Sequence, residues 1–285
     1  MTRLATGDVK SISAELSKYD AVLAAKTGYS LRGVACLAAG VAEEEIKNRI
    51  KDPFIGVIPI TSGEGVIAGF CEAVAGIVSH LGCRTFITQA TDVAGLAEAF
   101  EKKADIIMLA DDHRFIALHA ASRQLIDNAT ATGKGFVAGM RLMADDLKKR
   151  NVLVIGCGPV GQSATKELVA MDVSVSIYDI NPARSIDLAE RLKQLPNAKI
   201  QIIKDLDRAL QTHKFIIEAS PAAKLIHARH IRADTYISAP GVPVGLDQEA
   251  LLKIGNRLLH DPLQLGVATM TMLAFKFHMN AKYIG

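Results

Sequence analysis

Residues 151–168 read NVLVIGCGPVGQSATKEL and combine an apolar strand, a glycine-rich turn and the start of a helix. In such a turn Gly156 suits the tight bend, Gly158 lets the backbone approach a phosphate, and Gly161 lets helix and strand pack closely. The stretch therefore predicts a cradle for the pyrophosphate of a dinucleotide. Because strand, turn and helix occur together, the signal is stronger than three isolated glycines would be.

The residues around this turn supply the rest of a dinucleotide site. Pro159 and Val160 open the helix, whose first amides lack backbone partners and attract an anion. Asp179 ends the next apolar run, 18 residues after Gly161, where a carboxylate accepts hydrogen bonds from the adenosine ribose. That carboxylate repels a 2′-phosphate, so the sequence predicts NAD as the cofactor, while Arg184 keeps NADP as an alternative.

Strand-like and helical patterns alternate throughout residues 149–285. The apolar runs are VLVIG, VSVSIYD, KIQII, FIIEA and TYISAP. This alternation predicts an α/β fold with a C-terminal doubly wound parallel sheet of the Rossmann type. Small residues and prolines follow the last two runs, at the carboxyl edge of the sheet, where ligands bind. We expect these residues to line the nicotinamide half of the cofactor site: Ser220, Pro221, Ala239 and Pro240.

Residues 1–148 predict a smaller α/β domain that would bind the substrate. A helical pattern covers residues 8–25, and the strand candidates FIGVIPI, RTFITQ and DIIMLA alternate with helical patterns beginning at Val66 and Val93. The polar stretch DNATATGKG reads as a loop that leads into a linking helix, GFVAGMRLMADDLKKR. The last apolar helix, QLGVATMTMLAFKFHM, would return from the second domain to the first.

Composition excludes several classes of partner. The 285 residues are 49% hydrophobic, and 33 basic against 30 acidic side chains leave a net charge of +3, which argues against nucleic acid or an anionic membrane surface. The four cysteines lie far apart without metal-ligand spacing, which favours reduced thiols in the cytoplasm. His227 and His230 read as surface residues, so the sequence predicts no metal site. Apolar helices such as the last leave a homodimer open.

The loop ITSGEG, after the first strand candidate, is the predicted substrate loop. Thr61 and Ser62 offer hydroxyls, and the amides at the start of the helix expected to follow favour a carboxylate. Gly63 and Glu64 complete the predicted loop.

Acidic residues also follow two later runs. Asp111 and Asp112 end a strand, where a carboxylate can grip an ammonium or act as a base, and Asp261 precedes the last helix. Successive side chains alternate in direction, so Asp111 and Asp112 cannot share one face of a continuing strand. Capping of the following helix is the alternative interpretation of these acids.

These motifs carry a resemblance to a known family. The order RLATGDVKSI, VPITSGEG, MLADD, VLVIGCGPVG, EASPAA, APGVP and DPLQLGVATM resembles the pyrrolysine synthases over nearly the whole chain. The resemblance implies an NAD-dependent dehydrogenase that oxidises the terminal amine of L-lysine-Nε-3-methyl-D-ornithine. The imine hydrolyses, ammonia leaves, and the α-amine of the ornithine condenses to close the ring of L-pyrrolysine.

The resemblance also implies roles for particular residues. It makes Leu4 and its helix a cover over the substrate, Ser62 a substrate contact, and Asp111 the principal polar residue. The chemistry of the amine leaves open whether Asp111 or Asp261 accepts its proton or stabilises the iminium that follows. Two positions depart from the family: Glu64 replaces an amide, and Asp261 replaces a longer glutamate. Two alternatives stay open, namely another two-domain dehydrogenase acting on a shikimate-type or amino-acid substrate, and a non-catalytic NAD sensor.

Overall fold

The computed structural model describes residues 4–281 and divides the chain into two compact units. The first unit contains the chain up to Ala25, Tyr29–Gly135 and the segment from Leu263 onward. The second contains Lys26–Gly28 and Phe136–Pro262. The packing thus divides the chain between residues 135 and 136, inside a helix, whereas the sequence suggests 148/149. Each unit is described by itself below.

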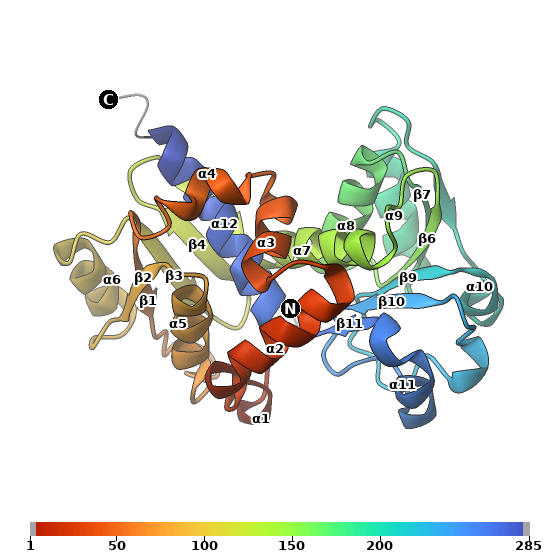
Figure 1. Ribbon diagram of the computed structural model, residues 1–285, viewed down its shortest axis with the longest axis horizontal. Helices are drawn as coiled ribbons and strands as arrows, with labels where there is room; N and C mark the ends of the chain where they lie inside the picture. The colour runs from red at the N-terminus through yellow and green to blue at the C-terminus, as the bar shows by residue number, and fades with distance from the viewer. Residues whose placement is uncertain (1–3, 282–285) are drawn as a thin grey trace. The chain divides into compact units, whose positions relative to one another are not determined.

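The second unit is built on a six-stranded sheet in the order β11-β10-β9-β6-β7-β8 (Figure 1). All neighbouring strands are parallel. Its strands are β6 (Asn151–Ile155), β7 (Ser174–Tyr178), β8 (Ile200–Ile202), β9 (Phe215–Glu218), β10 (Tyr236–Ala239) and β11 (Leu258–His260). Counted within the unit, this is the order 3-2-1-4-5-6 of a dinucleotide-binding sheet. The predicted Rossmann fold is confirmed, although the short β11 was not expected from the sequence.

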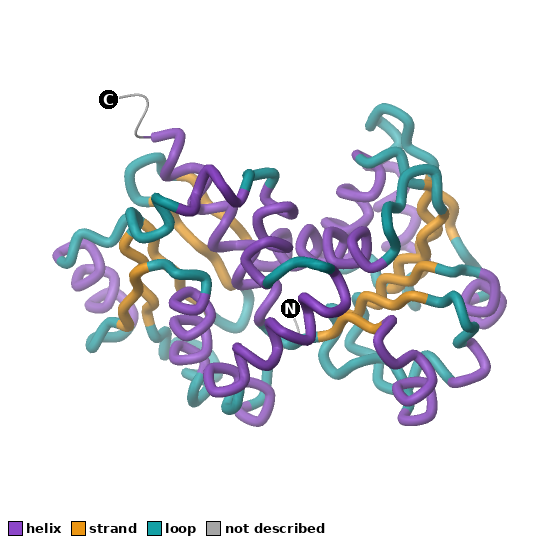
Figure 2. Tube along the Cα trace, viewed as in Figure 1, coloured by secondary structure: helices purple, strands orange, loops and turns teal. Residues whose placement is uncertain are grey.

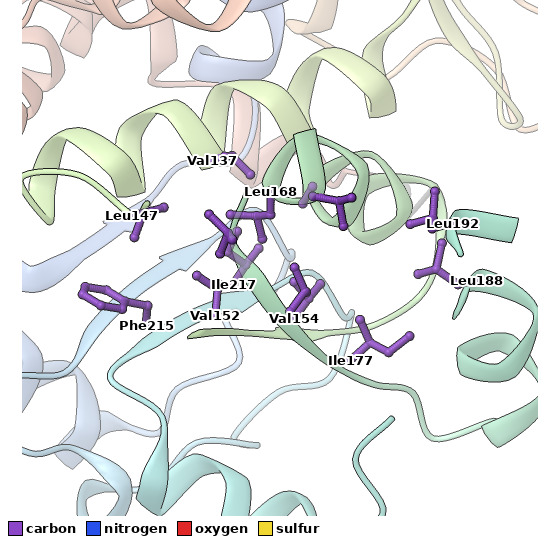
Figure 3. Packing of buried hydrophobic residues seen from close by; sticks show 14 of the residues in the cluster. Val137, Leu147, Val152, Val154, Leu168, Ile177, Leu188, Leu192, Phe215 and Ile217 are labelled. Carbon is purple, nitrogen blue, oxygen red and sulfur yellow. The ribbon is translucent and has the colours of Figure 1, made fainter. Parts of the chain in front are cut away.

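Both faces of this sheet are covered, as a parallel sheet requires (Figure 2). Alternate residues of β6 enter different apolar clusters: Val152 and Val154 belong to one, Leu153 and Ile155 to the other. Figure 3 shows the first cluster, in which Val152 and Val154 gather with Leu168 and other apolar side chains from the helices. The α-helices that begin in this unit are α8 (Pro159–Ala170), α9 (Pro182–Leu192), α10 (Leu206–Thr212) and α11 (Gln248–Ile254).

Two of these helices begin directly after the carboxyl ends of strands. Gly158 is the N-cap of α8 and Pro159 its first residue, a position where proline costs no backbone hydrogen bond. Asn181 caps α9, because its side chain accepts a hydrogen bond from Ala183 N at 3.1 Å. Local sequence therefore fixes both helix starts at the edge of the sheet where ligands bind.

The first unit contains a five-stranded mixed sheet in the order β2-β1-β3-β4-β5. Its strands are β1 (Phe54–Ile58), β2 (Arg84–Ile87), β3 (Ile106–Ala110), β4 (Phe115–His119) and β5 (Gln124–Asp127). β1, β2 and β3 are parallel, as predicted, whereas β4 and β5 are antiparallel additions that the sequence did not reveal. Because β4 follows β3 closely, the acids after β3 lie in a tight turn between strands.

Besides the last helix of the chain, seven helices begin in this unit, and two of them start away from the predicted positions. They are α1 (Thr6–Val9), α2 (Ile12–Thr27), α3 (Leu31–Ala39), α4 (Glu43–Lys47), α5 (Phe70–His80), α6 (Asp92–Glu101) and α7 (Asn128–Met143), among the described residues. α5 begins at Phe70 rather than Val66, after Gly69 in a left-handed conformation. α7 begins at Asn128, so the polar stretch read as a loop is the first half of the helix.

The last helix, α12 (Gln264–Ala281), packs against α3, α5, β4 and β5. Its apolar residues are buried there, including Val267, Met270 and Phe275, each at 0% exposure. The helix therefore belongs to the core of the first unit, in agreement with its predicted return to the first domain, although the sequence counted it within residues 149–285. Because this face is used internally, α12 does not supply the apolar surface for the homodimer, which stays a prediction.

Candidate active site

The three glycines after β6 have separate steric roles. Gly156 has φ +92°, and a Cβ there would lie 2.7 Å from Ala219 O. A Cβ on Gly161 would lie 1.8 Å from Gly156 O, so the start of α8 and the end of β6 approach each other as only glycine allows. Gly158, in contrast, has open space within 4 Å of its Cβ position. This arrangement fits a phosphate lying against Gly158 and the first free N–H groups of α8. Pro159 and Val160 are the residues that open this helix.

Asp179, after β7, is bound to the glycine turn. Its Oδ2 accepts a hydrogen bond from Cys157 N at 2.8 Å, and its Oδ1 accepts one from Asn181 N at 2.8 Å. Asp179 as a whole is only 8% exposed. Each carboxylate oxygen has a second lone pair, so these bonds are compatible with the predicted contact to ribose hydroxyls. Burial raises the pKa of the Cys157 thiol, which makes this cysteine a neutral packing residue.

The residues predicted to line the nicotinamide half lie at the carboxyl ends of β9 and β10. Ser220 and Pro221 follow β9, Ala239 ends β10, and Pro240 follows it. Ala219 N donates to Ile155 O at 2.8 Å, so the loop after β9 is adjacent to the glycine turn. The structure thus brings the predicted cofactor residues of the second unit to one edge of one sheet, while their roles stay predictions.

Glu218, the last residue of β9, is a functional candidate that the sequence reasoning missed. Glu218 is fully buried, at 0% exposure. Oε1 accepts hydrogen bonds from Ser220 N at 2.9 Å and Ser220 Oγ at 2.5 Å, and Oε2 accepts one from Gly245 N at 3.2 Å. Burial raises the pKa of Glu218 to about 7, against the lowering effect of these hydrogen bonds. The sequence did contain a signal for this residue, an acid at the end of an apolar run and two positions before Ser220.

In the first unit, two carboxylates hold the predicted substrate loop. Thr61 donates through its amide to Asp92 Oδ1 at 2.8 Å and through Oγ1 to Asp92 Oδ2 at 2.5 Å. The hydrogen bond from the Thr61 side chain lowers the pKa of Asp92 most, and the bond from the Thr61 amide lowers it further. Glu64 N donates to Asp112 Oδ2 at 2.7 Å. Sequence reasoning missed Asp92 in this role, because its partner is far away in the chain.

The prediction that a helix starts directly after this loop and supplies its amides to a carboxylate is wrong. α5 begins at Phe70, and residues 65–69 separate it from Glu64. The loop amide that does bind a carboxylate binds Asp112 of the same chain. Ser62 is exposed, with its carbonyl accepting a hydrogen bond from Gly65 N at 3.4 Å.

Asp111 is exposed in the turn between β3 and β4. Its Oδ1 accepts hydrogen bonds from Arg114 N at 2.7 Å and His113 N at 2.8 Å. These two bonds, with Arg114 first, lower the pKa of Asp111, so its carboxylate stays ionised throughout the neutral range. The alternative that Asp111 or Asp112 caps a following helix is wrong, because the next element is β4.

The two remaining predicted residues lie in different units. Leu4 is partly buried in the first unit and precedes α1 rather than lying within a helix. Asp261 follows β11 in the second unit and is 3% exposed. α12 begins at Gln264, whose Oε1 accepts a hydrogen bond from Leu263 N at 3.2 Å.

The interpretation of His227 and His230 as surface residues is wrong for His230. His230 is 2% exposed, and its Nε2 lies 2.8 Å from Asp207 Oδ1, a hydrogen bond that compensates for burial. His227 is partly exposed and pairs through Nδ1 with Asp247 Oδ2 at 2.7 Å. Within residues 4–281 there is no group of three or more His, Cys, Asp or Glu side chains placed to hold a metal ion. In the same range, no helix combines the length and apolar character needed to cross a membrane.

A glycine turn on a 3-2-1-4-5-6 sheet, in a chain whose other unit is also α/β, defines the fold class of the two-domain dehydrogenases. Quinate dehydrogenase from Corynebacterium glutamicum, solved with NAD, has a TM-score of 0.54 at 13% identity, covering 79% of this chain and 94% of that one. Shikimate dehydrogenase from Aquifex aeolicus has a TM-score of 0.54 at 15% identity, covering 79% and 91%. Residues 139–237 match the family model described as shikimate / quinate 5-dehydrogenase.

More specific similarity comes from sequence relatives. Residues 8–126 match the family model described as pyrrolysine biosynthesis protein PylD, N-terminal domain. Pyrrolysine synthase from Methanosarcina barkeri is 29% identical over 272 residues, covering 95% of this chain and 97% of its own length. Pyrrolysine synthase from Methanosarcina acetivorans is 29% identical, covering 95% and 98%. The resemblance to pyrrolysine synthases is thereby confirmed: the chain is their homologue, and its class is oxidoreductase.

Proposed function

We propose that this protein oxidises the terminal amine of L-lysine-Nε-3-methyl-D-ornithine with NAD and yields L-pyrrolysine and ammonia. The observation that carries the proposal is similarity to pyrrolysine synthases over 95% of the chain, in a molecule whose second unit has a dinucleotide-type glycine turn. The four buried, unpaired cysteines are in keeping with a reaction carried out in the cytoplasm.

The residues of the second unit fit a dinucleotide. Its pyrophosphate would lie over Gly158, where a Cβ position has no neighbour within 4 Å, and its ribose would meet Asp179. The Asp179 carboxylate supports NAD over NADP, because a 2′-phosphate would be repelled; the exposed Arg184 is the feature in favour of NADP. When bound, NAD would supply the acceptor for a hydride.

The substrate amine sets a requirement for proton handling. An alkyl ammonium with a pKa of about 10.4 has no lone pair to expel a hydride, so a proton must first leave the nitrogen. Loss of hydride from the adjacent carbon then leaves an iminium, which adds water and releases ammonia to give an aldehyde. The α-amine of the ornithine condenses with that aldehyde and loses water to close the ring.

The two candidate acids suit different steps of this reaction. Hydrogen bonds keep Asp111 ionised at neutral pH, which makes it a poor proton acceptor but a constant negative charge beside an ammonium or iminium. We therefore assign Asp111 to cation stabilisation. Asp261, buried after β11, is the candidate for accepting the proton.

Asp111→Asn is expected to lower turnover by at least about 100-fold. An asparagine Oδ1 can still accept the bonds from His113 N and Arg114 N, so the variant removes the charge and keeps the turn. Turnover would be followed as NADH absorbance with the lysine-ornithine substrate, with ammonia and product mass measured in the same sample. Asp187→Asn, an exposed site on α9, is the matched control.

Full turnover in Asp111→Asn would overturn the assignment of this residue. A wild-type protein that binds NADH but leaves the lysine-ornithine compound unchanged would overturn the substrate. In that case, oxidation of a shikimate-type or amino-acid substrate would identify the other two-domain dehydrogenase. Binding without turnover of any such compound would favour an NAD sensor.

Gly63→Ala tests the substrate loop. A Cβ on Gly63 would lie 1.9 Å from Asp112 Oδ2, so the variant must displace the carboxylate that holds Glu64 N. We expect KM for the lysine-ornithine substrate to rise about tenfold, the cost of a lost charge-assisted hydrogen bond, with NADH affinity unchanged. Gly65→Ala is the control, since that residue also has positive φ but its Cβ would meet Thr61 O only at 3.9 Å. Equal changes in both variants would contradict a role for the Asp112 contact.

A further inference from the structure

We propose that Glu218 is a positioning residue that joins the loop after β9 to the loop after β10 and thereby shapes the nicotinamide half of the cofactor site. The inference rests on the nicotinamide cofactor of the proposed function. It does not depend on which substrate is oxidised.

The hydrogen bonds of Glu218 connect two separate loops. Oε1 receives the amide and hydroxyl of Ser220, in the loop that follows β9. Oε2 receives the amide of Gly245, 27 residues later in the chain and beyond β10. Gly241 N also donates to the carbonyl oxygen of Glu218 at 3.2 Å. One buried residue thus fixes the start of the first loop and both ends of the second.

The loop after β10 leaves room for this carboxylate by carrying glycines beside it. A Cβ on Gly245 would lie 2.7 Å from Glu218 Cδ, and a Cβ on Gly241 would lie 2.9 Å from Glu218 Oε2 and 2.2 Å from Ser220 O. These approaches bring the backbones of the two loops together at the carboxyl edge of the sheet. Residues predicted to contact the nicotinamide, Ser220 and Pro240, lie in these same two loops.

The donors around Glu218 match an ionised carboxylate. Two N–H groups and one O–H group point at its two oxygens, and a carboxylate accepts all three. A glutamine at this position would turn an NH2 group toward one of these donors and leave at least one of them unpaired. A protonated Glu218 would likewise lose an acceptor. The geometry therefore makes the two loops sensitive to the charge of this side chain.

Ionisable groups near Glu218 lie on other elements. Asp179 follows β7, His260 is the last residue of β11, and Asp261 follows β11. Both strands lie two positions away from β9 in the sheet. His260 Nδ1 is 2.7 Å from Ala239 O at the end of β10, and Lys224 is exposed further along the loop after β9. Burial raises the pKa of Glu218 to about 7, so its charge changes within the neutral range.

The test compares two ligands that share an adenine half, NADH and ADP-ribose, in Glu218→Gln and wild type. Affinities would be measured by calorimetry at pH 8 and pH 6. At pH 8 we expect the variant to bind NADH about tenfold more weakly and ADP-ribose with unchanged affinity. In wild type, the ratio of NADH to ADP-ribose affinity should fall from pH 8 to pH 6, and in the variant it should stay constant. Glu249→Gln, an exposed site on α11, should behave as wild type.

Several results would overturn the inference. Equal loss of NADH and ADP-ribose affinity would show a general fold defect, and unchanged NADH affinity would show that the two loops do not need the charge. If Glu218→Gln fails to fold, Ser220→Ala removes one donor and should weaken NADH binding selectively; no selective loss in that variant rejects the proposal. Failure of the lysine-ornithine compound as a substrate leaves this binding comparison standing. A wild-type protein that binds neither ligand rejects the inference together with the cofactor assignment.

Discussion

Gly161→Ala is expected to lower the free energy of unfolding of the second unit by about 3 kcal/mol and to abolish dinucleotide binding. The added Cβ would lie 1.8 Å from Gly156 O, which is a backbone atom that cannot rotate away. Either α8 must shift from the end of β6 or the glycine turn must change shape. Urea unfolding followed by circular dichroism measures the first effect, and NADH titration measures the second.

Gly158→Ala is the matched control for this prediction. Its Cβ would have no neighbour within 4 Å, so the unfolding free energy should stay within about 0.5 kcal/mol of wild type. NADH binding should nevertheless weaken, because the new methyl group occupies space proposed for the pyrophosphate. Wild-type stability in Gly161→Ala would contradict the close approach of α8 to β6. Unchanged NADH affinity in Gly158→Ala would contradict the location of the pyrophosphate.

The free energy of unfolding is expected to decrease by roughly 3 kcal/mol as pH rises from about 4.5 to 7, because of Glu218. Its folded-state pKa of about 7 lies above the ordinary value of 4.5. Between these values the unfolded chain has released the proton and the folded chain retains it, so the contribution is fully present below pH 4.5 and lost as pH rises through 7. Urea midpoints measured across this range would record the decrease.

Glu218→Gln should remove this pH dependence, whatever its effect on absolute stability. The carboxyls whose pKa values are lowered, such as those of Asp92, Asp111 and Asp207, titrate below this range and have the opposite effect only at more acid pH. An unchanged slope in the variant would show that another group causes the pH dependence. If the unfolding free energy of the wild-type protein does not change between pH 4.5 and 7, Glu218 is ionised across the whole range.

The features that the sequence predicted correctly are those determined by neighbouring residues. The positions of α8 and α9 follow from Pro159, Asn181 and Pro182, which act within one turn of the helices they start. The long alternation of apolar strands and helices predicted the parallel sheet of the second unit. The resemblance to pyrrolysine synthases likewise depended on short, contiguous motifs that could be read along the chain.

The features that it missed depend on distant residues or on short elements. β4, β5 and β11 are as short as the predicted strands, but only alternate or single residues of them are buried, whereas four of the five residues are buried in β1 and in β6. The bonds that occupy the TSGEG loop join Glu64 to Asp112, 48 residues apart, and Thr61 to Asp92, 31 residues apart. Burial of Glu218 likewise depends on Gly245. Side-chain pairing of this kind becomes visible only when the strands are assembled.

The contact between Asp112 and Glu64 N has a consequence for which molecules this loop tolerates. The Glu64 amide already donates its hydrogen bond to a carboxylate of its own chain, so it has no second hydrogen for the carboxylate of another molecule. Asp92, bound by the amide and hydroxyl of Thr61, adds another negative charge beside the loop. An approaching acid would therefore meet electrostatic repulsion, whereas an amine would be attracted. If the loop binds the substrate as proposed, the charges of its own support would select a basic metabolite over an acidic one before the loop touches either.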